Sequence, residues 1–371
     1  MKTASDDIVY VPAEVLQGFV EQVFVELGTP PDDARICAEV LVASDLRGIE
    51  SHGVGRLKVY YDRIRAGVQL VKTEMEIVKE TETTAVVDGH HGMGAIIAFR
   101  SMRLAMDKAR QYGLGAVAVR NSTHFGIAGY YALMAAREGM IGLAVTNARP
   151  VIAPTFGAEP MLGTNPIAFA APSDADFPFC FDAATSTVSR GKIEVLVRAE
   201  KPTPEGWAVG ATGQPVTDSR HILRSLATGE AMLLPLGGAG EATGGYKGFD
   251  LATVVEILCA SLCGGAFMKD LLGFAPDGSR RPYMLGHFFL AIHIEHFVPL
   301  DVFKRITGQI MRRLQNAHKA PGQERIYVAG EKEHEKQQLV RERGIPVNRN
   351  LRRDLQTVRD ELGIAGYETY F

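Results

Sequence analysis

The stretch from Ser44 to Leu57 holds the residues whose types and spacing are best suited to chemistry. Ser51 and His52 stand together, and Arg56 follows four residues after the histidine. If Ser51 caps a helix, His52 opens it and Arg56 lies one turn further along the same face. An imidazole can protonate a developing alkoxide while a guanidinium binds a carboxylate. The pattern predicts a site that reduces 2-oxo acids; a helix-start residue beside a surface cation is the alternative.

The residues that follow His52 supply two faces of this predicted helix. Tyr60 and Arg63 continue the polar face. A separate stripe of apolar residues recurs at helical spacing and predicts that the helix packs on a core: Val54, Leu57, Tyr61 and Ile64. The proton donor and the fixed cation would therefore lie side by side on an anchored helix.

Composition and charge are those of an ordinary globular protein. The chain has 371 residues, 46% of them hydrophobic and 22% charged, and this length favours two domains over one. The net charge of −3 gives no electrostatic reason to expect nucleic acid or an anionic membrane as a partner. Residues 1–10 lack the basic start and apolar core of a secretory signal.

Two further features favour a cytoplasmic protein without a membrane span. The most apolar long stretch, 249–268, contains Asp250 and Glu256, which favours a buried helix over a membrane span. The four cysteines have neither metal-knuckle nor CxxC spacing, which predicts buried free thiols in a reducing compartment: Cys37, Cys180, Cys259 and Cys263.

Hydrophobic periodicity divides the chain into a helical start, a mixed centre and a helical end. The start is predicted to be helical at 12–27, again after Pro30 and Pro31, and from Ser51. In the centre, short apolar runs bounded by turn residues predict strands at 85–88, 115–120, 142–146, 167–171, 179–182, 206–209 and 283–295. Helices are predicted between them at 95–111, 127–138, 187–199 and 247–264, and at the end at 300–317, 331–343 and 350–362.

This order of elements predicts an α+β fold. We expect residues 1–78 and 305–371 to form one discontinuous helical domain and residues 79–304 to form a second domain around a sheet. Binding sites commonly form in the crevice between domains, which would bring the histidine and arginine to that crevice.

The chain lacks the usual dinucleotide motif but has other places for phosphates. No Gly-x-Gly-x-x-Gly follows a predicted strand, which disfavours a standard Rossmann site. Residues 182–186 end a strand and are predicted to open a helix, with Arg190 and Lys192 close behind. The glycine-rich loop 237–248 carries Lys247 near its end, although a plain turn explains such a loop equally well.

Taken together, these segments resemble the type 2 malate/L-lactate dehydrogenase family, which also contains ureidoglycolate, sulfolactate and diketogulonate oxidoreductases and cyclic imino-acid reductases. The resemblance extends through nearly the whole chain and depends on SHGVGR at 51–56, STHFGIAGYYA at 122–132, GTNPIAFAAP at 163–172, DAATSTVSRGKIEV at 182–195, GGYKGF at 244–249, GHFFLAI at 286–292 and PGQE at 321–324. It implies a nicotinamide cofactor bound without a Rossmann fold, on a largely antiparallel sheet domain in the cleft facing the helical domain. It also implies a homodimer.

The resemblance further implies roles for individual residues. His52 matches the proton donor, Ser51 its hydrogen-bonding neighbour, and Arg56 the arginine that binds the substrate carboxylate. Other substrate contacts match Thr164, Arg190 and Gly191. The cofactor contacts match His124, Phe125, Gly126, Ile127 and Ala128, then Asp182, Ala183 and Ala184, then Lys247 and Gly248, and finally Pro321, Gly322, Gln323 and Glu324. For His124, a backbone hydrogen bond between a strand and a helix is the structural alternative.

The expected reaction is oxidation of L-malate to oxaloacetate and its reverse. Malate is favoured because GHFFLAI and the loop before Lys247 resemble malate-type members more closely than imino-acid reductases. A dicarboxylate needs a second cation, for which Arg149 and Arg190 are the candidates. NAD is favoured over NADP because the turn at 321–324 carries few cations. Lactate, sulfolactate, ureidoglycolate and cyclic imino acids are the alternative substrates.

Two other functional classes compete with this interpretation. A metal-dependent hydrolase or lyase could use His287, His293 and His296, but they lie in a strand-like run without HExxH order, and no metal is expected. A non-catalytic nucleotide-binding protein is the third class, and no missing motif favours it.

Overall fold

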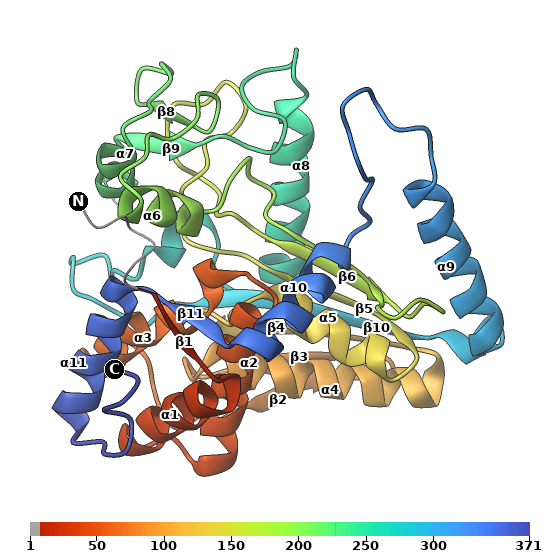
Figure 1. The fold of residues 1–371 in the computed structure, drawn as a ribbon, viewed down its shortest axis with the longest axis horizontal. Helices are drawn as coiled ribbons and strands as arrows, with labels where there is room; N and C mark the ends of the chain where they lie inside the picture. The colour runs from red at the N-terminus through yellow and green to blue at the C-terminus, as the bar shows by residue number, and fades with distance from the viewer. Residues whose placement is uncertain (1–7, 227) are drawn as a thin grey trace.

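The computed structural model describes residues 8–226 and 228–371, which form an α+β protein around one seven-stranded sheet (Figure 1). The strand order is β2-β3-β4-β10-β5-β6-β7, and every neighbouring pair is antiparallel except β3 with β4. The strands are β2 Glu76–Glu80, β3 Thr84–Asp88, β4 Leu114–Ser122, β10 Leu285–His293, β5 Met140–Thr146, β6 Ile167–Ala171 and β7 Phe179–Ala183. The predicted fold class, with a largely antiparallel sheet, is confirmed.

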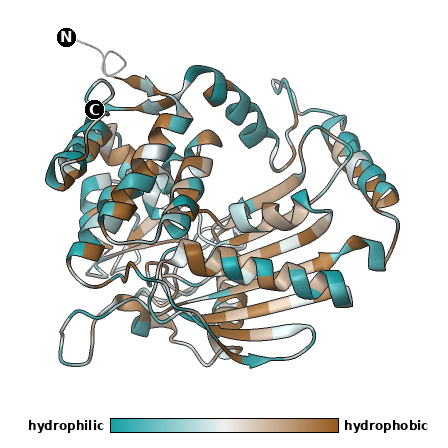
Figure 2. Ribbon diagram, turned by 90° about the horizontal axis from the view of Figure 1, so that it is seen from below, coloured by the Kyte–Doolittle hydropathy of each residue, from teal (hydrophilic) through white to brown (hydrophobic). Residues whose placement is uncertain are grey.

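Two helices cover one face of this sheet. The helix α4 (Gly94–Tyr112) packs on β4 and β10, and α5 (Ala128–Arg137) packs on β5 and β6. Apolar residues fill the space between these layers, among them Val117, Phe289 and Ala144. In Figure 2 the strands are largely brown, whereas the outer helices show both teal and brown along their length. The mixture of polar and apolar residues along these helices is typical of helices that bury one side against the sheet.

The two ends of the chain meet in a group of helices beside the sheet (Figure 1). The short strands β1 (Val9–Val11) and β11 (Ile345–Val347) pair antiparallel and join the N-terminal segment to the C-terminal one. The helices of this region are α1 Ala13–Glu26, α2 Pro31–Leu46, α3 Leu57–Arg65, α10 Glu331–Arg343 and α11 Arg349–Leu362. The division into domains at 78/79 and 304/305 stays a prediction.

A smaller layer of elements lies next to the start of α3. It consists of α6 Arg190–Arg198, α7 Ser219–Ser225, and the paired strands β8 Ala208–Gly210 and β9 Ala231–Leu233. Its own apolar cluster includes Ile193, Ile222 and Leu233. The helix α8 (Gly245–Glu256) follows and packs on the second face of the sheet, where Val255 meets Val145.

Several element boundaries differ from the sequence prediction. The predicted helix 247–264 becomes α8 and then a π-helical turn at Ile257–Ser261, and the predicted helix 187–199 begins only at Arg190. The edge strand β2 was not predicted, because all five of its residues are exposed and carry no apolar alternation. The helix α9 (Leu300–Gln315) stands at one end of the sheet, away from α1 and α11 (Figure 1). Within the described residues, no helix is both long and apolar enough to cross a membrane.

Candidate active site

The sequence prediction placed the start of a helix at Ser51, and the structure corrects this. Two short 3-10 turns, Glu50–His52 and Val54–Arg56, come first, with extended backbone at Gly53 between them. The α-helix begins at Leu57, and Ser51 caps no helix. The apolar stripe beyond it is confirmed, because Leu57 and Tyr61 are buried.

Buried Asp45, near the end of α2, explains why the helix starts late. Its Oδ2 atom accepts a hydrogen bond from the Val54 N–H at 2.7 Å. A Cβ atom at Gly53 would lie 1.8 Å from Asp45 Oδ1, so only glycine lets the backbone pass this close. Burial raises the pKa of Asp45 to about 8. The backbone therefore turns around this carboxyl group instead of closing a regular helical turn.

Ser51 and Arg56 hold the imidazole of His52 in place. The Ser51 hydroxyl lies 2.9 Å from His52 Nδ1, and Arg56 Nε donates to the Ser51 carbonyl at 2.7 Å. Burial, and after it the nearby positive charge of Arg56, together lower the pKa of His52 to about 4. In the ligand-free protein His52 is thus neutral at physiological pH and can accept a proton.

Arg56 faces the start of α6. Its Nη2 lies 3.1 Å from Glu194 Oε2, and the same carboxylate pairs with Arg190 Nε at 3.2 Å. Gly191 lets α6 approach this closely, because a Cβ atom there would lie 2.5 Å from Ser51 Cβ. Glu194 therefore fixes the direction of the Arg56 guanidinium and neutralises part of its charge.

A second imidazole, His124, stacks against the first. It follows β4, and its ring lies 5.6 Å from the His52 ring with 20° between the planes. Both the Tyr60 hydroxyl, at 2.6 Å, and the Gly126 N–H, at 3.3 Å, contact His124 Nδ1. A neutral His124 that accepts at Nδ1 carries its proton on Nε2. Burial lowers the pKa of His124 well below its ordinary value, with His52 as the next cause.

One cavity of about 220 Å³ brings most of the predicted substrate residues together. His52 and His124 line it from two different parts of the fold. The predicted residues on its wall are His52, Arg56, His124, Arg149, Thr164, Arg190 and Gly191. The residues of the wall that were not predicted as contacts include Val59, Arg63, Glu194 and Tyr283.

A buried polar network positions the loop that carries Arg149 and Thr164. Asn165 Oδ1 accepts from the Ala148 N–H at 3.0 Å, and Asn165 Nδ2 donates to Glu256 Oε2 at 2.8 Å. Glu256 Oε1 also accepts from the Met268 N–H, so α8 and this loop are linked through one carboxyl group. Because buried polar groups are costly when unpaired, this fully bonded network holds the loop firmly.

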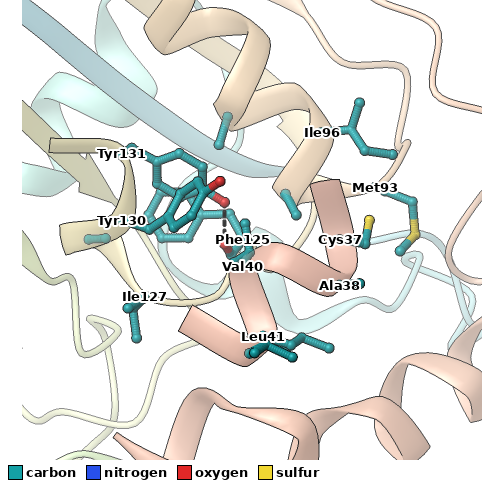
Figure 3. Close-up of a cluster of buried hydrophobic side chains, with 14 of the residues drawn as sticks. Cys37, Ala38, Val40, Leu41, Met93, Ile96, Phe125, Ile127, Tyr130 and Tyr131 are labelled. Carbon is teal, nitrogen blue, oxygen red and sulfur yellow. Dashed lines mark hydrogen bonds between the residues drawn. The ribbon is translucent and has the colours of Figure 1, made fainter. Parts of the chain in front are cut away.

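The predicted cofactor segment after His124 packs mainly into the core (Figure 3). Phe125, Ile127 and Ala128 are buried, so their side chains belong to the core. Gly126 adopts φ +83°, and a Cβ atom there would lie 2.5 Å from Val40 of α2. The turn that carries His124 is thus fixed directly against the N-terminal helices.

The segment 182–186 does not open a helix, because α6 begins only at Arg190. Asp182 Oδ2 accepts from the Gly129 N–H at 2.7 Å in the first turn of α5, and burial raises the pKa of Asp182 to about 6. The hydroxyl of Thr185 donates to the Asn165 carbonyl at 3.0 Å. The predicted helix start at these residues is therefore wrong, and their role as a phosphate site stays a prediction.

The remaining predicted cofactor residues lie outside the cavity around His52. Asp182 and Ala183 end β7 and Ala184 follows it, and Lys247 and Gly248 stand in the first turn of α8. Pro321, Gly322, Gln323 and Glu324 are exposed on the loop between α9 and α10, which arches away from the body in Figure 1. Their cofactor roles stay predictions.

The histidines of the metal-based alternative are not brought together as ligands. His287 is buried and contacts Thr146 Oγ1 and Ser122 Oγ at 2.8 and 2.7 Å, while His293 is the last residue of β10 and His296 follows it. Among residues 8–226 and 228–371, no group of three or more His, Cys, Asp or Glu side chains is arranged to hold a metal ion.

Sequence reasoning missed the partners that come from distant elements. Tyr60 was placed on the polar face, but its bond to a histidine 64 residues away left no local signal. Tyr283 and Glu194 were not singled out, because neither has a spacing relation to His52 in the sequence.

Nearly the whole chain matches known proteins. A family model described as malate/L-lactate dehydrogenase matches residues 11–356. A malate dehydrogenase of Pyrococcus horikoshii is 44% identical over 97% of this chain and 98% of its own length. An L-sulfolactate dehydrogenase of Methanocaldococcus jannaschii is 38% identical over 92% of this chain and 94% of its own length. The crystal structure of malate dehydrogenase from Entamoeba histolytica superposes with a TM-score of 0.94 at 41% identity, and covers 97% of this chain and 99% of that one.

More distant relatives are named for their cofactors. A ureidoglycolate dehydrogenase of Escherichia coli is named for NAD(+) at 30% identity, and a (2R)-3-sulfolactate dehydrogenase of Chromohalobacter salexigens is named for NADP(+) at 35% identity. From the family model, the full-length relatives and the shared fold, the chain belongs to the malate/L-lactate dehydrogenase family.

Proposed function

We propose that this chain, a 2-hydroxy acid dehydrogenase by its family, interconverts malate and oxaloacetate with a nicotinamide cofactor. The observation that carries the proposal is the single cavity in which His52 and His124 face Arg56 and Arg149. Such a cavity offers a proton-transfer group and cations for an anionic substrate. Lactate, sulfolactate, ureidoglycolate and cyclic imino acids remain the alternative substrates.

His52 is assigned the proton transfer. In the oxidation of malate, the neutral imidazole takes the hydroxyl proton, and in the reverse direction it returns a proton to the carbonyl oxygen. The contact of Ser51 with Nδ1 fixes the ring, so that Nε2 is the atom that exchanges the proton. General acid–base help of this kind is typically worth about 10²–10⁴ in rate.

Arg56 is assigned the substrate carboxylate that adjoins the reacting carbon. Its Nη2 is already paired with Glu194, and its Nε with the Ser51 carbonyl. The substrate carboxylate therefore meets a guanidinium whose orientation is set in advance, which reduces the ordering cost of binding. Thr164 and Gly191, on the same wall, complete the assigned substrate contacts.

The predicted cofactor residues fit a dinucleotide chemically. Lys247 lies in the first turn of α8, whose N-terminus has no side-chain cap, and within the described residues no carboxylate pairs with this lysine. A lysine at the N-terminus of a helix is suited to a pyrophosphate, because both the lysine and the helix dipole favour negative charge. The bound nicotinamide supplies or accepts the hydride. We favour NAD, with NADP as the alternative.

Replacement of the two imidazoles tests the assignment. We expect His52→Ala to lower kcat at least about 100-fold, because proton transfer is lost, while the affinity for NADH stays nearly unchanged. NADH absorbance gives the turnover, and calorimetric titration gives the cofactor affinity. His221→Ala, at an exposed position on α7, is the control and should keep normal activity. Near-normal turnover in His52→Ala would refute the assignment.

His124 is the second candidate for proton donor, because two donors at Nδ1 leave its Nε2 protonated. If His52 is the donor, His124→Ala should chiefly raise the KM for NADH and lower kcat less than tenfold. If instead His124→Ala lowers kcat at least about 100-fold and His52→Ala chiefly raises the KM for NADH, the proton donor is His124.

We also propose that the protein is a cytoplasmic homodimer. All four cysteines are unpaired and buried, which suits a reducing compartment. Large apolar side chains are exposed on α9 and on α8 with the π-helical turn: Ile306, Ile310 and Leu314, and Leu251, Val254 and Ile257. A second copy of the chain would cover these surfaces, since exposed apolar patches commonly mark interfaces.

A further inference from the structure

A second cavity of about 280 Å³ opens beside the one that holds His52. Four residues line both cavities: Val59, Arg63, Arg149 and Tyr283. Arg280 and Arg281 also line the second cavity. The two spaces thus meet at a wall that carries two guanidinium groups and one aromatic ring.

Tyr283 organises this shared wall. The guanidinium carbon of Arg63 lies 4.8 Å from the centre of its ring, and that of Arg149 lies 5.8 Å away. The carbonyl of Tyr283 lies 3.2 Å from His91 Nδ1, which ties the loop before β10 to the body of the protein. Cation–π contacts hold both guanidiniums near the ring without neutralising their charge.

Charges on this wall remain open for a ligand. Within residues 8–226 and 228–371, no carboxylate forms an ion pair with Arg63 or Arg149, and Asp62, which lines the second cavity, pairs with Lys58. Arg149 Nε is buried and has no hydrogen-bond partner, although buried polar groups are nearly always bonded. By contrast, Glu194 already binds both Arg56 and Arg190.

This contrast chooses between the two candidates for the second cation. Arg190 is paired with Glu194 four residues later, whereas Arg149 has a buried donor that is unsatisfied. We infer that Arg149, supported by Arg63 and Tyr283, is a subsite for the second anionic group of the substrate. Its ligand is a carboxylate or sulfonate on the carbon next to the reacting one, which a guanidinium binds through paired hydrogen bonds.

This inference rests on the proposed function, because the reacting carbon is placed by His52 and Arg56. It adds that the chain selects dianionic 2-oxo acids. A substrate such as pyruvate, which has a plain methyl group where the dianions have an anion-bearing methylene, leaves the buried Arg149 donor without a partner, and this costs binding free energy.

Arg149→Met tests the subsite, since it removes the charge and keeps most of the side-chain length. Steady-state kinetics compare oxaloacetate, 3-sulfopyruvate and pyruvate, with NADH as cofactor. We expect kcat/KM for both dianions to fall roughly 10- to 100-fold and for pyruvate to change less than threefold, as expected from a lost charged hydrogen bond. The dianion with the higher kcat/KM in the wild type shows whether the natural second group is a carboxylate or a sulfonate.

Arg65→Met is the matched control, because Arg65 lies exposed on α3 and lines neither cavity. It should leave kcat/KM for all three substrates within twofold of the wild-type values. An equal loss for dianions and pyruvate in Arg149→Met would overturn the inference. So would a raised KM for NADH with an unchanged substrate ratio, because the anion would then be a cofactor phosphate.

A binding measurement separates this inference from the proposed function. Calorimetric titration of the wild type with succinate and with propionate, neither of which reacts, should show tighter binding of succinate, and Arg149→Met should abolish the difference. If no 2-oxo acid is reduced but this difference is found, the proposed function fails and the dianion subsite stands. Equal binding of both acids by the wild type would refute the subsite.

Discussion

At the scale of single residues, the site depends on an imidazole kept neutral by its surroundings. Burial removes the water that would solvate an imidazolium, and Arg56 repels its charge, so the pKa of His52 falls to about 4. The folded protein therefore binds this proton less readily than the unfolded chain. The contribution of this pKa shift to the free energy of unfolding is present above about pH 6.5, and it is lost as the pH falls through about 4.

The proposed role of His52 in proton transfer predicts the pH profile of malate oxidation. Because kcat/KM reports the free enzyme, its acidic limb should lie near pH 4, and the rate should stay level from about pH 5 to 8. The measurement is kcat/KM across this range, with circular dichroism at each pH to show that the protein remains folded. An acidic limb between about pH 6 and 7 would mean that the catalytic imidazole is solvated like a free one.

At the scale of elements, α6 determines the shape of the cavity that His52 lines. Its first residues carry Arg190 and Glu194, and the space for its approach to Ser51 exists because position 191 has no side chain. The Arg56 Nη2 atom would lie 3.2 Å from a Cβ at this position, so a side chain there presses on both Ser51 and Arg56. The helix would have to move away from the 3-10 turns.

Gly191→Ala is therefore expected to damage catalysis while the fold persists. Displacement of α6 by a fraction of an ångström to one ångström should lower kcat/KM at least about tenfold, since misplaced catalytic groups lose orientation. Kinetics and thermal unfolding are measured together. Lys192→Ala, at the exposed neighbouring position, is the control and should leave both unchanged. Full activity in Gly191→Ala would show that the contact between α6 and Ser51 is dispensable.

At the scale of the whole molecule, the most conspicuous feature is apolar surface without a partner in the single chain. Ile306, Ile310 and Leu314 recur at helical spacing on α9 and are each about half exposed, while Gly308 and Met311 are its buried residues. Figure 2 shows brown segments on this helix at the edge of the molecule. A helix with such an outward apolar side is stable in water only if something covers it.

The dimer proposal makes a direct prediction. Ile310→Glu should shift the protein from the mass of two chains to that of one in light scattering after gel filtration, because a buried carboxylate at an interface lacks a partner. Val25→Glu, at an exposed position on α1, is the matched control and should not change the mass. If the wild type already has the mass of one chain, the homodimer proposal is wrong.

Local sequence determined much of the fold. The helices α1, α4 and α11 and the strands β4, β5 and β10 were predictable, because a helical or alternating apolar pattern requires only that one side be buried. His52 and Arg56 were also identified from four residues of spacing, and Leu57 and Tyr61 of the apolar stripe are buried as predicted. These features depend on neighbours in the chain.

Tertiary structure alone decided the rest. The helix at Ser51 was predicted too early because Asp45, held in the core by α2, bonds to the Val54 N–H and turns the backbone. The contacts of Tyr60 with His124, and of Arg63 and Arg149 with Tyr283, join segments 64 or more residues apart. A sequence pattern records which residues share a helix face, but the distance between two faces is set by packing, and catalysis depends on that distance.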